Sequence, residues 1–398
     1  MKRIITYILA AFFTLVTLTA NAQDYLNRDY FLDGIVAQGY EIINVENHGV
    51  KGFIDDRSYD LPELVRNYSF SIVKKYSKGY PSKPSGIMLR WNSSTPVEEI
   101  SSLVVSVVES EVARDESILE SGKVRAKRYY PSANSKEYLL CNMCPQMYCY
   151  YKVEEVLNSG ERKIVKTGKF YTEGQVRMLR VDGMANVRDF GGWPTIFYRP
   201  VLYGRIFRGN RPEVITATGR NDFVKNERIT ADLDLRGSNL SKSPLGPLSE
   251  VEYYCTNNQR YKLALTSGTA ALAKDLNIIA KVLRKGGNVF LHCNHGMNRA
   301  GTLSFLIEGI LGLDEADLTR DYELSSFAYG SSRSNTYGDM LPYIRSYGSR
   351  SDDLAQCFYN YARSIGVTEE TLDIIRSEML GIPLDDPLIL DAHRKKNN

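Results

Sequence analysis

A cysteine and an arginine, six positions apart, are the residues of this sequence best suited to chemistry. Cys293 follows His292 at the end of a short apolar run, and Arg299 opens a stretch with helical spacing. A thiolate is a strong nucleophile, and a guanidinium holds two phosphate oxygens with a planar fork of donors. The backbone N–H groups between them can curl around an anion at a helix start. The predicted phosphate-binding residues are Asn294, His295, Gly296, Met297, Asn298 and Arg299.

Three groups next to Cys293 favour negative charge on its sulfur: the start of the helix, Arg299 and His292. We therefore predict that Cys293, Arg299 and His292 are catalytic. A thiolate in line behind a bound phosphorus atom predicts phosphoryl transfer to cysteine, followed by hydrolysis of the phosphocysteine.

The elements on either side of this loop can be predicted from hydrophobic spacing. Residues 289–291 form a short apolar run after two glycines, which predicts a buried strand. From Ala300 the apolar residues recur at helical spacing, and Gly312 is a plausible stop for that helix. Strands alternating with helices before and after this segment predict a central, mostly parallel sheet flanked by helices, with the site at the carboxyl ends of the strands.

The stretch HCNHGMNR, residues 292–299, resembles the HCxxGxxR signature of cysteine-dependent protein tyrosine and dual-specificity phosphatases. Three earlier stretches, NVRDFGG, YGRIFRG and TADLDLRG, resemble the ordered landmarks of the bacterial type of tyrosine phosphatase. The resemblance runs from about Asp182 to Leu380. It implies an α/β phosphatase domain over residues 180–398 that needs no cofactor and no metal.

Arg236 leaves a predicted strand end within this domain, which makes it a possible substrate contact. The alternative is a structural ion pair, with Asp189 as a candidate partner. We expect Arg208 and Asn186 to hold the architecture. A helix contact comes first, and a substrate contact second, for Asp321, Tyr322 and Glu323.

The catalytic loop departs from the family at the positions that handle protons. Asn298 stands where the tyrosine phosphatases have an aspartic acid, and Ala300 replaces a threonine. No Asp or Glu lies between Tyr253 and Lys274, where other cysteine phosphatases carry a general acid. His295 is a candidate proton donor, or else shapes the loop by a hydrogen bond.

The loop also resembles the HCxHGxNRTG version found in RNA 5′-triphosphatases. It therefore suits transfer without an acid, which favours phosphotyrosine, phosphoanhydrides and inositol polyphosphates over phosphoserine.

The N-terminal part reads differently. Residues 1–22 have a basic start, an apolar run and an Ala-Asn-Ala end, which predicts a signal peptide and a periplasmic or secreted protein. Residues 23–179 contain several short strands with turn signals between them, which predicts an all-β sandwich domain ahead of the phosphatase domain. The segment NMCPQMYCYYKV resembles part of a fibronectin type III domain. We expect the clustered cysteines to lie in the β core, with a disulfide or a zinc site as the alternative; they are Cys141, Cys144 and Cys149.

Composition narrows the partners. The net charge of +3 gives no field for nucleic acid, and no stretch after the signal predicts stable membrane insertion. The expected partner is a phosphorylated protein or a small phosphorylated substrate, and the oligomeric state is left open. The main hypothesis is an exported tyrosine phosphatase; the alternatives are an inositol polyphosphate phosphatase of the same mechanism and a phosphate-binding pseudo-phosphatase.

Overall fold

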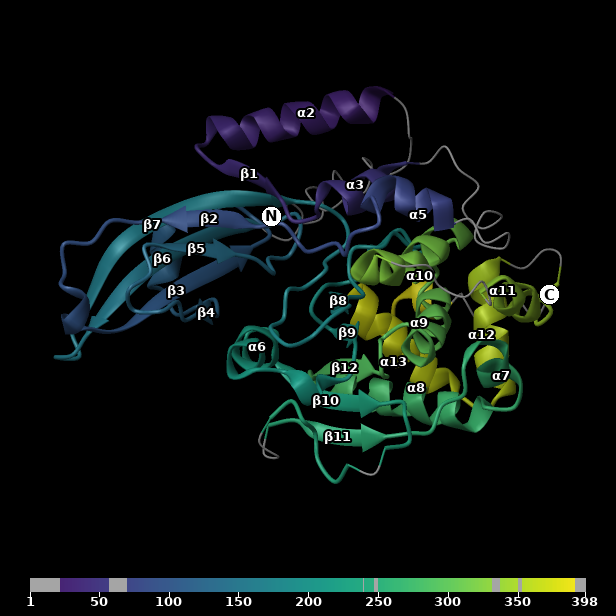
Figure 1. The fold of residues 1–398 in the computed structure, drawn as a ribbon. Coiled ribbons are helices and arrows are strands. Elements are labelled where there is room, and N and C mark those ends of the chain that lie inside the picture. Colours follow the sequence, from purple (N-terminus) through teal and green to yellow (C-terminus); the bar gives the residue numbers. More distant parts are fainter. Residues whose placement is uncertain are drawn as a thin grey trace.

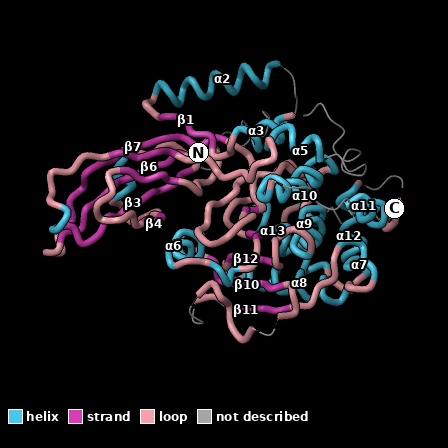
Figure 2. Tube along the Cα trace, in the orientation of Figure 1, coloured by secondary structure: helices cyan, strands magenta, loops and turns pink. Residues whose placement is uncertain are grey.

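The computed structural model describes residues 22–56, 70–238, 240–246, 250–330, 337–349 and 353–390. The predicted signal peptide falls outside these residues apart from Ala22. In the described ranges, no helix is both long enough and apolar enough to cross a bilayer. Figure 1 shows a strand-rich N-terminal half beside a helix-rich C-terminal half, and Figure 2 shows the same division by element type.

The N-terminal half contains a five-stranded sheet in the order β1-β7-β6-β3-β4 and a two-stranded sheet of β2 and β5. Its strands are β1 (Glu41–Asn44), β2 (Ile87–Arg90), β3 (Ile100–Ser110), β4 (Lys127–Tyr129), β5 (Glu137–Leu140), β6 (Tyr148–Leu157) and β7 (Arg162–Glu173). The short strands predicted within residues 23–179 are therefore present. A tight turn with Gly160 at φ +88° joins β6 to β7.

Strand β3 is apolar along most of its length because both faces of the large sheet are covered. On one face, Val105 and Val107 pack in a core with Leu89 of the two-stranded sheet. On the other face, Val108 packs with Ile35 of helix α2 (Ala22–Ala37), which lies across the sheet in Figure 1. The two sheets enclose one core, as in a sandwich, and the likeness to a fibronectin type III domain stays a prediction.

The three clustered cysteines lie in this half without a disulfide. Cys141 and Cys149 are buried, and Cys144 is partly buried at the turn before β6. Among the described residues, no three His, Cys, Asp or Glu side chains are grouped so that they could hold a metal ion.

Two helices of the N-terminal chain pack on the C-terminal half. Helices α3 (His48–Asp55) and α5 (Phe70–Ser77) lie against α10 (Glu315–Tyr329). The rings of Phe53 and Phe327 are 5.0 Å apart, and Val50 and Val73 belong to the same core cluster. Residues 23–80 show little hydrophobic periodicity, because the short apolar faces of α3 and α5 pack on a helix far along the chain.

The C-terminal half is built on a five-stranded sheet in the order β11-β10-β12-β9-β8. Strands β9, β12, β10 and β11 pair in parallel, and β8 is antiparallel to β9. Their bounds are β8 (Arg188–Asp189), β9 (Ile206–Gly209), β10 (Ile229–Asp234), β11 (Glu252–Cys255) and β12 (Asn288–His292). Gly209, Asp234 and Cys255 end their strands level with His292, so these carboxyl ends share one edge.

The central strand β12 is buried on both faces. Val289 and Leu291 pack with the helices, while Phe290 packs with Phe207 and Phe223 on the opposite face. The remaining helices of this half are α6 (Ala217–Arg220), α7 (Tyr261–Thr266), α8 (Thr269–Arg284), α9 (Arg299–Ile310), α11 (Tyr337–Arg345), α12 (Leu354–Ser364), α13 (Glu369–Leu380) and α14 (Pro387–Leu390).

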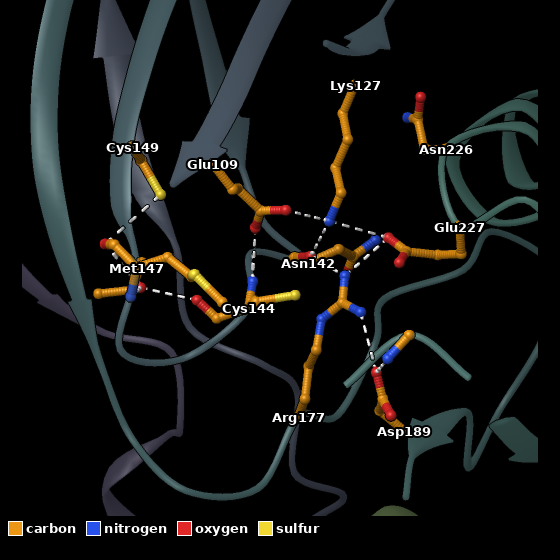
Figure 3. Close-up of polar contacts among 12 residues, drawn as sticks. Glu109, Lys127, Asn142, Cys144, Met147, Cys149, Arg177, Asp189, Asn226 and Glu227 are labelled. Carbon is orange, nitrogen blue, oxygen red and sulfur yellow. Dashed lines mark hydrogen bonds and ion pairs between the residues drawn. The ribbon is translucent and has the colours of Figure 1, made fainter. Parts of the chain in front are cut away.

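A buried group of charges joins the two halves (Figure 3). Arg177 donates to Glu227 at 2.7 Å and to Asp189 at 3.0 Å, both in the C-terminal half. Lys127 of β4 pairs with Glu227 at 3.2 Å and with Glu109 of β3 at 2.7 Å. Burial would raise the pKa of Glu227, but Arg177 and Lys127 outweigh it and hold that pKa below its ordinary value. The carboxylate is therefore ionised and ties the halves together.

Candidate active site

The loop of residues 293–298 connects β12 to α9 at the carboxyl edge of the parallel sheet. Gly296 has φ +68°, and a Cβ at this position would lie 2.5 Å from backbone atoms of Gly209. Only glycine fits such a position, because it tolerates a left-handed backbone and leaves room for the neighbouring strand. The loop is therefore pressed against the end of β9, and Gly312, at φ +86°, follows the end of α9 as expected.

The carbonyl groups of this loop are occupied by donors from outside it. Asn186 Nδ2 donates to the His295 carbonyl at 3.0 Å, and the Tyr329 hydroxyl donates to the same oxygen at 2.7 Å. Arg208 Nη2 donates to the Gly296 carbonyl at 3.0 Å. Burial raises the pKa of Tyr329 to about 12, so this hydroxyl remains a donor at neutral pH. Three segments far apart in the sequence thus hold the loop by its carbonyl oxygens.

The N–H groups of the loop are left open. Within the described residues, the backbone N–H groups of Asn294, His295, Gly296 and Asn298 have no hydrogen-bond partner. A row of backbone N–H groups without protein acceptors, at the start of a helix, is suited to an anion.

Arg299 is fixed at one nitrogen and open at the other two. Its Nε donates to the backbone carbonyl of Asn258 at 2.9 Å. Its terminal nitrogens have no protein partner among the described residues. A guanidinium held in this way presents a preformed fork to an anion with two oxygens in one plane.

A buried ion network supports the loop from behind. Arg188 contacts the carboxylate of Asp321 at 3.1 Å, and Arg208 contacts it at 2.8 Å. Burial opposes ionisation of Asp321, but the two arginines outweigh it and lower its pKa to about 2. Burial and the nearby Asp321 charge raise the pKa of Glu308 well above its ordinary value, so Glu308 is protonated. Asp321 is therefore ionised, and it holds both arginines in place behind the loop.

Cys293 lies at the base of this cradle, with 4% of its surface exposed and no hydrogen-bond partner in the described part of the chain. The hydroxyl of Thr302 does not hydrogen-bond the Cys293 sulfur. Thr302 Oγ1 donates to the Asn298 carbonyl at 2.9 Å and accepts the Tyr261 N–H at 2.9 Å. The hydroxyl lost at Ala300 is therefore not replaced by Thr302.

The predicted site residues fall into two groups. Cys293, the loop donors and Arg299 converge, whereas His292 is fully buried behind them and stacks on Phe290. His292 Nε2 is 2.9 Å from an oxygen of Asp232, without the alignment of a hydrogen bond. His295 keeps an exposed side chain whose ring meets Tyr329 edge to face, while its carbonyl shapes the loop.

Arg236 is engaged by carboxylates. It contacts both oxygens of Asp234 at 2.8 Å and Glu213 at 2.7 Å. The ion pair suggested with Asp189 was wrong, because Asp189 is turned toward Arg177. A contact between Arg236 and substrate stays a prediction.

Four residues near the loop were not singled out from the sequence. Asn258 and Tyr261, after β11, contact Arg299, Asn298 and Thr302; Tyr329 supports His295; and Asp275 accepts a bond from Asn258 Nδ2 at 2.5 Å. No local motif marks them, since each acts through a contact across the fold.

Comparison with known proteins places the chain in a family. A model of the tyrosine phosphatase family matches residues 179–381, a range that includes the five-stranded sheet, the loop at Cys293 and the supporting network. No curated protein matches the chain. The family model covers just over half of the sequence, and the chain belongs to the tyrosine phosphatase family.

Proposed function

We propose that this chain is an exported cysteine-dependent phosphatase that hydrolyses aryl phosphate esters, with phosphotyrosine in proteins as its substrate class. The observation that carries the proposal is the set of unpaired donors around Cys293. Four backbone N–H groups and the two terminal nitrogens of Arg299 lack protein partners in the described residues. A bound phosphate would supply an acceptor for each of them.

The proposed reaction has two steps. The Cys293 thiolate attacks phosphorus, so that an S–P bond forms while the bond from phosphorus to the leaving oxygen breaks. Water then attacks the phosphocysteine, the S–P bond breaks, and inorganic phosphate leaves with the thiolate regenerated. Arg299 and the loop N–H groups stabilise the charge on the phosphoryl oxygens in both steps.

The choice of an aryl ester follows from the groups that handle protons. Asn298 has no acidic proton to give, and the described residues between Tyr253 and Lys274 contain no carboxylic acid. We therefore propose that the leaving oxygen departs with its negative charge, without proton transfer from a carboxylic acid. A tyrosine phenolate, the conjugate base of a phenol with an ordinary pKa of about 10, leaves far more easily than a serine alkoxide.

Export and partner identity rest on the sequence. The N-terminal stretch has the pattern of a signal peptide, and the chain has a net charge of only +3. We therefore place the enzyme in the periplasm or outside the cell, acting on a phosphorylated protein, without nucleic acid, cofactor or metal.

The test is phosphate release by the full chain from three substrates: p-nitrophenyl phosphate, a phosphotyrosyl peptide and inositol hexakisphosphate, with Cys293→Ser measured in parallel. The proposal expects turnover of the two aryl esters and none by the variant.

The other outcomes separate the alternatives. Turnover of inositol hexakisphosphate with none of the peptide would replace the substrate class but keep the mechanism. Binding of phosphate without turnover of any substrate would identify a pseudo-phosphatase. Activity that survives in Cys293→Ser would remove the proposed nucleophile.

A further inference from the structure

The short segment after β11 touches the catalytic loop at the position where the family has its acid. The Tyr261 hydroxyl donates to Asn298 Oδ1 at 2.6 Å. The Tyr261 N–H donates to Thr302 Oγ1 at 2.9 Å, so both ends of this residue are fixed to the loop and the first turn of α9.

The backbone of Tyr261 indicates that this position is under constraint. Its φ is +57°, in the left-handed region that a residue with a large side chain rarely adopts. Such a conformation persists only where the surroundings hold it, and it is concentrated at functional sites. The second independent observation is the open amide nitrogen of Asn298, which has no partner among the described residues.

We propose that Tyr261 is a positioning residue that turns the Asn298 side chain so that its amide nitrogen faces the leaving oxygen of the substrate. The hydroxyl of Tyr261 occupies the amide oxygen, and the amide N–H groups are then directed to the other side. The opposite orientation would point a carbonyl oxygen at a bound phosphate dianion, which is electrostatically unfavourable. This inference rests on the proposed function, because it concerns the same reaction.

Asn298 would then act as a hydrogen-bond donor in place of an acid. When the bond from phosphorus to oxygen breaks, its electron pair stays on the leaving oxygen, and an amide N–H stabilises that charge without giving up its proton. The released phenolate takes its proton from water after it leaves. The contribution is largest for a leaving group that carries much charge in the transition state and smallest for one that delocalises it.

The test compares two esters of different leaving-group quality, phenyl phosphate and p-nitrophenyl phosphate. Each is assayed with wild type, Tyr261→Phe, Asn298→Ala and the double variant. Inorganic phosphate is used as a competitive inhibitor in every case. The matched control is Tyr254→Phe, since the Tyr254 hydroxyl on β11 bonds to Glu252 and not to the loop.

Tyr261→Phe should lower kcat on phenyl phosphate about tenfold, the loss expected for one hydrogen bond to a charged group, and on p-nitrophenyl phosphate only about twofold. Inhibition by inorganic phosphate should stay within about twofold of wild type, because Arg299 and the loop N–H groups are untouched. In the Asn298→Ala background, the further change from Tyr261→Phe should vanish.

Equal losses on both esters, or losses that add in the double variant, would show that Tyr261 only supports the fold and would overturn the inference. The proposed function would stand in that case, since wild type still turns over both esters. If Tyr261→Phe does not fold, the leaving-group selectivity of Asn298→Ala decides: a uniform loss there also overturns the assignment. A wild-type chain inactive on both esters would overturn both proposals.

Discussion

The cluster at the interface of the two halves and the region around the loop at Cys293 have the same kinds of side chain: arginine, cysteine and, close by, buried carboxylates. At the interface, Arg177 donates to the carboxylates of Glu227 and Asp189 and to the backbone carbonyl of Asn142 (Figure 3). At the loop, the carbonyl of Asn258 is the one partner of Arg299 among the described residues. The first network is closed on itself, and the second is open toward a ligand.

The cysteines differ in the same way. Burial raises the pKa of Cys144 to about 12, and the nearby Glu109 carboxylate adds to that effect, so Cys144 is a neutral thiol. Cys293 instead begins the loop that leads from β12 into α9, and around it lie Arg299 and N–H groups that lack partners among the described residues. Donors that the protein leaves unpaired mark the site where an anion is expected.

The largest change in kcat should come from replacing a thiol by a hydroxyl at Cys293, compared with the same replacement at Cys144. Cys293→Ser should reduce kcat on p-nitrophenyl phosphate by roughly 10⁴-fold or more, because the nucleophile is lost. Cys144→Ser should change kcat by less than about threefold, since no role in the reaction is expected for a neutral buried thiol. Steady-state kinetics of both variants check this, and similar losses in the two would break the comparison.

The arginines should follow the same order. Arg299→Lys should lower kcat/KM by about 10²–10³-fold, because a lysine cannot reproduce the planar fork. Arg205→Lys is the control: Arg205 pairs with Glu378 at 2.6 Å, away from the loop, and its variant should stay within about twofold of wild type. A mild Arg299→Lys phenotype would mean that the open nitrogens do not bind the phosphoryl group.

Breaking the closed network should cost stability and leave the chemistry intact. Glu227→Gln removes the shared anion of Arg177 and Lys127, so the free energy of unfolding should fall by about 3 kcal/mol. Denaturant titration measures the loss. The kcat of the folded variant should match wild type, and a selective loss of kcat would show that the interface acts on the site.

The smallest effect concerns Asp275, the buried carboxyl behind Asn258 and Arg299. Burial raises its pKa to about 7, and no cation pairs with it among the described residues, in contrast to Glu227. The protonated carboxyl stabilises the folded protein, because the folded-state pKa lies above the unfolded value of about 3.9. This stabilisation is complete below the unfolded pKa and is lost as the pH rises toward about 7.

Wild type should therefore lose roughly 2–3 kcal/mol between pH 5 and pH 8 relative to Asp275→Asn. Denaturant titrations of both proteins at these two pH values test the sign. Parallel curves for the two proteins would place the pKa of Asp275 near its ordinary value.

The strand, turn and helix around Cys293 could be predicted because their signals are local. One stretch contains the apolar run before Cys293, the tight-turn glycine at position 296 and the helical spacing after Arg299. The observed β12 and α9 agree with these signals. The strands of the N-terminal half were also marked by alternation and turn residues.

The parts that escaped prediction depend on partners far along the chain. Helix α3 is completed by the contact of Phe53 with Phe327, and no local pattern reveals such a pairing. The partners of Arg236 were missed for two reasons. Its bond to Asp234, two residues earlier at the end of β10, has no distinctive sequence pattern, and Asp189 is taken by Arg177 from another segment. The contacts of Asn258 and Tyr261 with the loop are likewise set by the fold and not by spacing.

The most direct test of the account is to trap the intermediate. Wild-type protein is mixed with excess p-nitrophenyl phosphate, quenched during turnover, digested and examined by mass spectrometry. We predict one phosphoryl group on the peptide that contains Cys293, localised to the sulfur, and none on the peptide with Cys144. A phosphoryl group on His292 or His295, or steady turnover with no phosphorylated peptide under conditions that preserve thiophosphate esters, would contradict the account.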